Sequence, residues 1–201
     1  MSIHNCMEVI NPKLGRQDWV NAALETFMSK GIETVKVDAI AKSLKITRGS
    51  FYWHFKNLDD LLAAIVQEWQ AANTEEIVQT VEATGGEPSH RLLQLFEIAA
   101  RDDDRLEKAM RIWAIHDVRA AAAIERVDRQ RLAYLESLFL QIGFSPTDAE
   151  IRAQVAYSVR LGWFIIAVPS NPAKRLSEIH LVHKILTEHV EMPDGINRSL
   201  L

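Results

Sequence analysis

The chain has 201 residues, of which 48% are hydrophobic and 25% are charged, which is the composition of a globular protein rather than a disordered or fibrous one. Its formal net charge of −4 argues against nucleic-acid binding, but residues 1–60 carry eight Lys or Arg and seven Asp or Glu, whereas residues 61–201 carry fifteen and twenty. The single cysteine, Cys6, excludes an internal disulfide and fits a reducing cytoplasm, and the longest apolar run, 162–169, is too short to span a membrane.

The spacing of apolar residues predicts helices along almost the whole chain, without an alternating strand pattern or an internal repeat. Gly31 is expected to end the first helix, and Thr47 and Asn57 are expected to cap later ones. Pro88 starts another helix after the break at 83–88. The expected helices cover about 12–29, 37–44, 48–54, 57–81, 88–101, 103–118, 120–142, 147–168 and 173–190. We therefore expect an all-α protein of about nine helices.

The segment 30–58 has the parts that a DNA-reading helix-turn-helix needs. An apolar seam between its two short helices is supplied by Ile40, Ala41, Leu44 and Ile46. The second helix opens with small or polar side chains, which the major groove can accommodate. These side chains belong to Thr47, Arg48, Gly49 and Ser50. Four cations and no acid lie between 41 and 58, so the segment forms a local basic patch.

Individual roles follow from the chemistry of these side chains. Arg48 can pair with guanine O6 and N7, a contact worth roughly 1–3 kcal/mol of discrimination. Phe51 and Phe55 are four residues apart and are expected to anchor the second helix to the core. Tyr52 and His54 lie in the same aromatic cluster, which also contains Trp53, and they can point outward to phosphate, as can Lys56. The alternative interpretation is a helical corner whose aromatic residues serve only packing.

This stretch resembles the N-terminal signature of the TetR family of bacterial regulators. The matching residues are Arg16, Ala23, Phe27, Gly31, Ile40, Ala41, Thr47, Gly49, Phe51 to Asn57, Leu61 and Leu62. The resemblance covers about residues 12–65. It implies a TetR-type helix-turn-helix DNA-binding domain at 10–57 and an effector-binding and dimerisation domain at 58–201. It also implies that Thr47, Tyr52 and Lys56 contact phosphate while 48–50 approach bases. The predicted DNA-binding residues are Lys45, Thr47, Arg48, Gly49, Ser50, Tyr52, Trp53, His54 and Lys56.

Two positions depart from the family pattern. Lys45 occupies the turn position where the family usually has glycine, so a positive φ there costs about 1 kcal/mol or more. It also adds a cation near DNA. Leu58 stands where a lysine or arginine often contacts phosphate, so the salt dependence of DNA binding is expected to be shallower.

By resemblance, the last two long helices, about 147–168 and 173–190, form the dimer. The first of them is apolar over more than one face, which supports burial against a partner. A helix central to the monomer is the alternative. An effector pocket is expected between helices, with an apolar or aromatic ligand. Its candidate residues, each of which can also be plain core, are Trp69, Phe96, Met110, Trp113, His116, Tyr134, Tyr157 and Trp163.

The leading hypothesis is a homodimeric, ligand-responsive transcriptional regulator, a repressor that a small molecule releases from its operator. Its two recognition helices would lie about 34–36 Å apart on a near-palindromic double-stranded DNA. The sequence has no catalytic motif, so we expect no enzyme activity, cofactor or metal. A helical enzyme or metal protein that uses His180 and His183, near Glu188 and His189, is one alternative. A DNA-binding adaptor that senses nothing is another.

Overall fold

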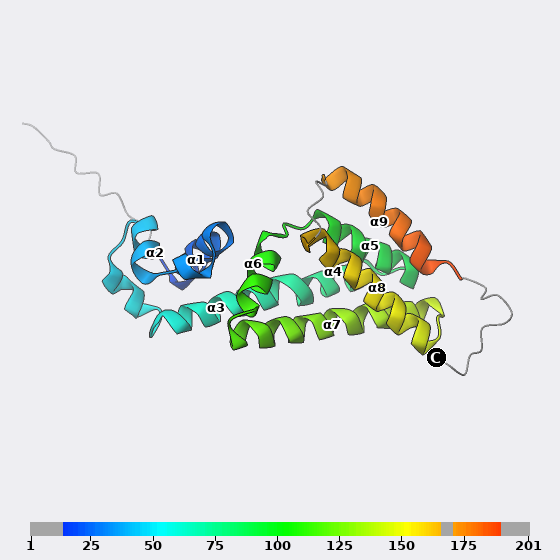
Figure 1. Cartoon of the computed structure of the whole chain (residues 1–201), viewed down its shortest axis with the longest axis horizontal. Coiled ribbons are helices and arrows are strands. Elements are labelled where there is room, and N and C mark those ends of the chain that lie inside the picture. The colour runs from blue at the N-terminus through cyan, green and yellow to red at the C-terminus, as the bar shows by residue number, and fades with distance from the viewer. Residues whose placement is uncertain (1–13, 166–170, 190–201) are drawn as a thin grey trace, which may run out of the picture.

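The computed structural model describes residues 14–165 and 171–189, and within them the only regular structure is helical (Figure 1). The expected all-α fold is therefore confirmed. The α-helices are α1 (Arg16–Lys30), α2 (Val37–Ser43), α3 (Leu58–Gln70), α4 (Glu76–Thr84), α5 (Pro88–Arg101), α6 (Arg105–Ala114), α7 (Val118–Ile142), α8 (Pro146–Ile165) and α9 (Pro172–Thr187). The parts of the expected helices at 12–13, 166–168 and 190 lie outside the described residues. No helix of the described chain is long and apolar enough to cross a membrane.

Three of the expected helices differ from the structure in bounds or in helix type. The first helix starts at Arg16 and not near 12, because the Asp18 carboxylate accepts a hydrogen bond of 2.7 Å from the Gly15 N–H. The second helix of the helix-turn-helix is a 3₁₀ helix, η2 (Arg48–Trp53). The expected helix at 57–81 is divided by a π-helical turn, η3 (Ala71–Glu75), between α3 and α4.

The capping residues also differ in how they act. Asn57 caps α3 as predicted, because its Oδ1 accepts a hydrogen bond of 3.0 Å from the Asp60 N–H. Thr47 occupies the N-cap position of η2, but its side chain makes no cap hydrogen bond. Instead its carbonyl accepts hydrogen bonds from the N–H and the hydroxyl of Ser50.

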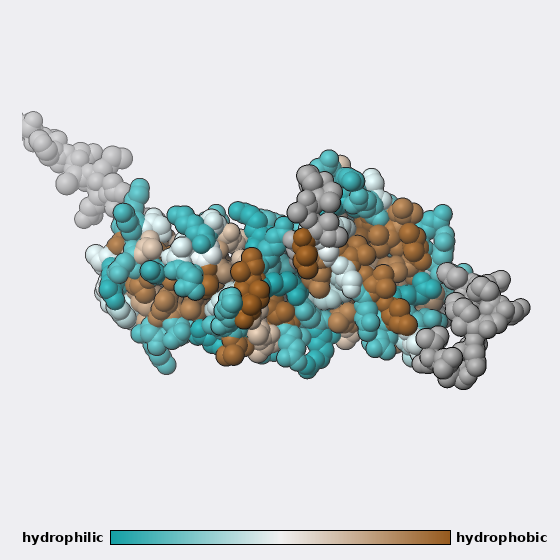
Figure 2. All heavy atoms as spheres, viewed as in Figure 1, coloured by the Kyte–Doolittle hydropathy of each residue, from teal (hydrophilic) through white to brown (hydrophobic). Residues whose placement is uncertain are grey.

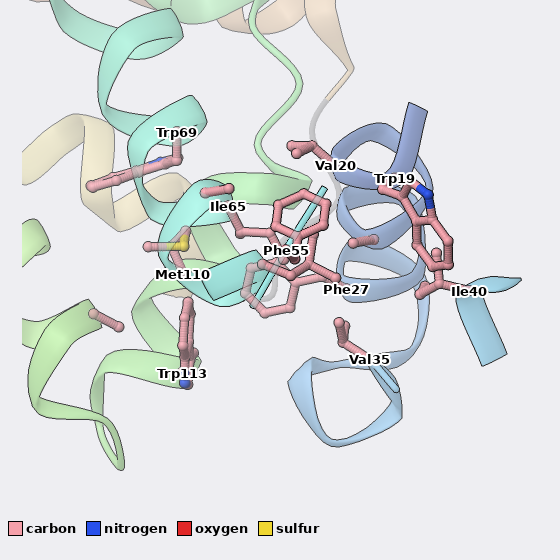
Figure 3. Close-up of a cluster of buried hydrophobic side chains, with 14 of the residues drawn as sticks. Trp19, Val20, Phe27, Val35, Ile40, Phe55, Ile65, Trp69, Met110 and Trp113 are labelled. Atoms are coloured by element: carbon pink, nitrogen blue, oxygen red, sulfur yellow. The ribbon is translucent and has the colours of Figure 1, made fainter. Parts of the chain in front are cut away.

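Two hydrophobic clusters hold the helices together. The first cluster contains Trp19, Phe27, Phe51 and Phe55 from the N-terminal region, and it continues through α3 to Met110 and Trp113 of α6 (Figure 3). The Phe27 and Trp113 rings meet edge-on with centroids 5.7 Å apart, so α1 is anchored directly to α6. The second cluster lies among α5, α7, α8 and α9 and contains Leu92, Phe96, Leu138, Phe139 and Ile179.

The turn between α2 and η2 depends on one unusual residue. Lys45 has a φ of 57°, so the positive φ predicted at this position is confirmed. The N–H of the next residue, Ile46, reaches back to the Ala41 carbonyl at 3.0 Å, and this bond closes the turn. The turn is therefore built on a conformation that a side chain with a Cβ disfavours.

We expect Lys45→Gly to stabilise the folded chain by about 0.5–1 kcal/mol, because glycine adopts a positive φ without strain but adds freedom to the unfolded chain. Urea unfolding followed by circular dichroism measures this. The matched control is Lys42→Gly, in the last turn of α2, which should destabilise by about 0.5–1 kcal/mol. Destabilisation by both substitutions would contradict the strain assigned to Lys45.

Candidate DNA-reading surface and ligand cavity

One face of the η2 helix is packed into the hydrophobic core. Phe51 and Phe55 are 0% and 2% exposed, and their rings stack with centroids 5.2 Å apart, as expected for anchors. Trp19 of α1 meets Phe51 edge-on at 5.1 Å, and the Arg16 guanidinium lies 4.9 Å from the centre of the Phe55 ring. The opposite face of η2 is therefore presented in a fixed orientation.

That opposite face carries the predicted DNA-binding residues. Most of them are exposed, and only Ser50 and His54 are half-buried. The Trp53 side chain is 78% exposed and Tyr52 is 53% exposed, although aromatic residues of this size are usually mostly buried. A Cβ added to Gly49 would meet only the Thr47 hydroxyl, at 3.8 Å, so the backbone of η2 is open to a ligand there.

Arg48 is held by two side chains in the structure. One guanidinium nitrogen lies 3.4 Å from the Asp38 carboxylate, and another lies 3.4 Å from the Tyr52 hydroxyl. The hydrogen bond to Tyr52, followed by the charge of Asp38, raises the pKa of Arg48. Asp38 lies on α2, ten residues before Arg48, and the sequence reasoning did not single it out. To reach a base edge, the Arg48 guanidinium would have to leave the Asp38 carboxylate.

A second candidate site is a cavity among α4, α5, α7, α8 and α9, with about 740 Å³ of empty space including its opening to solvent. Its walls are mainly aliphatic and aromatic. The apolar lining residues include Ile77, Val78, Leu95, Phe96, Leu135, Trp163 and Ile179. Polar groups enter the wall at Thr74, Asp102, Arg131 and Arg160. A mostly apolar cavity with a few convergent polar groups is the usual form of a small-molecule site.

Comparison with known proteins finds relatives of the helix-turn-helix segment. Residues 20–65 match the family model described as bacterial regulatory proteins, tetR family. The chain is 38% identical over 55 residues to the transcriptional regulator SrpR of Pseudomonas putida, and 40% identical over 50 residues to AcrR of Shigella flexneri. These segments cover 27% and 25% of this chain, and only 26% and 23% of the two relatives.

The N-terminal segment of the chain, residues 20–65, is therefore similar to that of TetR-family regulators. Solved structures extend the likeness in fold beyond the matched segment. A TetR/AcrR-family regulator from Thermobifida fusca has a TM-score of 0.65 at 19% identity, with 91% of this chain and 98% of the other covered. GusR of Salmonella enterica has a TM-score of 0.67 at 19% identity, with 89% and 96% covered. At this identity the likeness concerns the fold alone.

Half of the predicted ligand-binding residues line the cavity. Phe96, Tyr134, Tyr157 and Trp163 line it. Trp69 and Met110 are fully buried in the first hydrophobic cluster, away from the cavity wall. Trp113 belongs to that cluster as well, and it borders, together with His116, a separate surface cleft between α1 and α6. The polar residues of the wall are not among those predicted from the sequence.

A buried ion network forms part of the cavity wall. The Glu107 side chain is only 4% exposed and pairs with Arg111 at 2.7 Å and with Arg131 at 3.2 Å. Arg111 also binds Asp128 at 2.7 Å, and the Tyr157 hydroxyl donates a 2.6 Å hydrogen bond to the same carboxylate. Burial raises the pKa of Tyr157 to about 12, so this hydroxyl remains a donor. The network therefore connects α6, α7 and α8.

A second ion network includes Asp102 and Arg160 of the cavity wall. Asp104 pairs with Arg160 and with Arg175, each at 2.9 Å, and Arg160 also reaches Asp102 at 3.2 Å. Burial raises the pKa of Asp102 despite the nearby Arg160. The sequence does contain a signal for one charged residue of the cavity wall. Arg131 lies four residues from the buried Val127 and four from the buried Leu135, on one face of α7. A cation in the middle of an apolar helix face indicates a buried partner.

The histidines considered as metal ligands have other contacts. His180 lies 2.8 Å from a Glu97 carboxylate oxygen, and His183 lies 2.9 Å from the Ser89 carbonyl. Burial lowers the pKa of His183. Among the described residues no group of three or more His, Cys, Asp or Glu side chains is arranged to hold a metal ion.

We expect Glu107→Gln to destabilise the chain by roughly 3 kcal/mol, because it removes a buried charge that pairs with two half-buried arginines. Chemical denaturation measures the free energy of unfolding. The control is Arg129→Ala, which removes an exposed i,i+4 pair with Glu125 and should change stability by less than about 0.5 kcal/mol. Equal effects of the two substitutions would contradict the structural role of Glu107.

Proposed function

We propose that this protein is a TetR-family DNA-binding repressor whose operator affinity is controlled by a small molecule. The observation that carries the DNA-binding part is the rigid η2 helix, whose buried phenylalanines fix an exposed face of small, basic and aromatic side chains. Arg48, Gly49 and Ser50 would approach bases, and Thr47, Tyr52, His54 and Lys56 would contact phosphate. Lys45 and Trp53 flank this surface. Such a protein would act in the cytoplasm, where it meets DNA.

Selection of bound fragments from a random-sequence DNA library tests the DNA-binding proposal. The expected product is a near-palindrome, because a two-fold dimer presents two recognition helices to successive major grooves. The affinity for it should fall as salt rises, since phosphate contacts release counterions. Failure of folded protein to enrich any sequence at modest salt would overturn the proposal.

Arg48→Ala should relax the preference for one base pair in each half-site, at a cost of roughly 1–3 kcal/mol of discrimination. Fluorescence anisotropy with the selected operator and its single-base variants measures the preference. Arg126→Ala, an exposed substitution on α7, is the control and should leave it unchanged. An unaltered base preference in Arg48→Ala would remove Arg48 from the base-reading set.

The α8 and α9 helices are proposed to form the homodimer. Ile151 and Val155 on α8 are 49% and 45% exposed, and Leu181 and Ile185 on α9 are 59% and 57% exposed. In each helix the two residues are four apart and therefore share one face. Hydrophobic residues gather over this part of the molecule (Figure 2). Burying such a patch against a second copy would remove apolar surface from water.

The double substitution Val155→Asp and Leu181→Asp should convert the dimer to a monomer and weaken operator binding at least tenfold, because charges would be buried in the interface. Analytical ultracentrifugation measures the assembly state. Ile112→Asp is the matched control, since Ile112 on α6 is 66% exposed and borders the cleft between α1 and α6. A dimer that survives the double substitution and is lost in the control would place the interface elsewhere.

The effector is proposed to bind the cavity among α4, α5, α7, α8 and α9. The support is the apolar lining and the direct packing of α6 on α1, which joins the cavity wall to the DNA-binding region. A ligand that favours a conformer with different helix-turn-helix spacing would release the operator, by an amount set by its differential affinity for the two conformers. Operator release by a compound that protects the cavity from hydrogen exchange would test this part.

A further inference from the structure

One hydroxyl in the cavity wall has no partner. Thr74 lines the cavity and is only 6% exposed, and its Oγ1 makes no hydrogen bond. Leaving a buried hydroxyl unsatisfied costs about 1–3 kcal/mol. An unpaired buried donor of this kind either lowers the stability of the fold or forms a hydrogen bond to a ligand.

Three other helical threonines do form hydrogen bonds with their hydroxyls. Thr80 and Thr84, on α4 directly after Thr74, donate hydrogen bonds of 2.7 and 2.9 Å to the carbonyls four residues before them. Thr26 on α1 does the same at 2.8 Å. Thr74 lies in the π-helical turn η3, whose wider winding displaces the carbonyl that a threonine normally uses. The hydroxyl of Thr74, a residue that lines the cavity, therefore lacks the backbone partner that the other three threonines have.

The charged groups of the wall are already balanced. Arg111 and Arg131 face Glu107 and Asp128 in one network. Arg160 and Arg175 face Asp102 and Asp104 in the other network. The Tyr134 hydroxyl donates to Glu82 at 2.6 Å and that of Tyr157 donates to Asp128. An ionised ligand would therefore bring an uncompensated charge into a mainly apolar site, which is costly.

From these observations we propose that the cavity takes an uncharged, mainly apolar molecule that carries a hydrogen-bond acceptor, such as a ketone or ester oxygen, and that Thr74 donates to that acceptor. This inference rests on the proposed effector site and specifies the chemical class of its ligand. The apolar body would lie against the aliphatic and aromatic wall, and Thr74 would distinguish ligands with an acceptor from hydrocarbons of the same shape.

Three probes with related skeletons test the ligand class by isothermal titration of the full chain. These are 1-phenylpentan-1-one, which has a carbonyl oxygen, pentylbenzene, which lacks one, and 5-phenylpentanoate, which is an anion. We expect the ketone to bind about fivefold more tightly than pentylbenzene, because it satisfies one buried donor, and more tightly than the carboxylate. Tighter binding of pentylbenzene or of 5-phenylpentanoate than of the ketone would overturn the proposed class while leaving the effector site in place.

Substitutions at Thr74 assign the effect to its hydroxyl. Thr74→Val keeps the shape of the side chain, so it should weaken the ketone about fivefold and leave pentylbenzene unchanged, whereas Thr74→Ser should keep the preference for the ketone. Without ligand, Thr74→Val should raise the melting temperature by about 2–4 °C, since it removes an unpaired buried group. Unchanged ketone affinity in Thr74→Val, or a lower melting temperature, would overturn the role of Thr74.

A cavity-filling variant separates this inference from the proposed function. Ala99 lies in the cavity wall on α5, so Ala99→Phe should abolish binding of all three probes. Binding that survives Ala99→Phe, or no binding of any probe to the wild-type chain, would overturn both the ligand class and the proposed effector site. Neither result would bear on DNA binding, which the library selection tests by itself.

Discussion

The buried carboxylate of Glu107 is the constraint on which the two halves of the molecule depend. It is almost fully removed from solvent, and Arg111 and Arg131 supply the opposite charges that offset the cost of burying it. These pairs fix α6 against α7, and Asp128 and Tyr157 extend the network to α8. The same α6 carries Trp113, whose ring packs on Phe27 of α1. One short helix therefore touches both the cavity network and the DNA-binding region.

This arrangement gives a physical route between the cavity and the helix-turn-helix. Arg131 and Tyr157 are at once members of the ion network and parts of the cavity wall. A ligand that shifts either side chain disturbs the partners of Glu107, and a buried ion network tolerates only a few arrangements. Arg119 adds a second link, because it binds Asp59 at the start of α3 while it pairs with Asp117, whose pKa its hydrogen bond lowers to about 2. The helix-turn-helix is thus joined to the larger helical region through α1 and through α3.

Much of the fold and the exposed face of η2 could be predicted from the sequence, because local signals determine them. The spacing of apolar residues predicted the helices, and the order of residues 47–57 predicted the helix-turn-helix. The place of Lys45 in the turn predicted its positive φ. The cavity was only half predicted. Aromatic residues looked alike whether they packed in the core, as Trp69 does, or lined a space, as Trp163 does. The unpaired Thr74 depends on a π-helical turn, and the pairing of Arg160 with Asp104 joins residues 56 positions apart, so neither follows from local patterns.

The central claim is that filling the cavity changes the helix-turn-helix and so lowers the affinity for the operator. The affinity of Ala99→Phe for the selected operator tests it most directly, with Ala122→Phe, an exposed position on α7, as the control. If the two sites are coupled, Ala99→Phe should remain folded and dimeric but bind the operator at least about fivefold more weakly than the wild-type chain, which is the lower end of usual allosteric coupling. A folded, dimeric Ala99→Phe that binds the operator as tightly as the wild type and the control would contradict the claim.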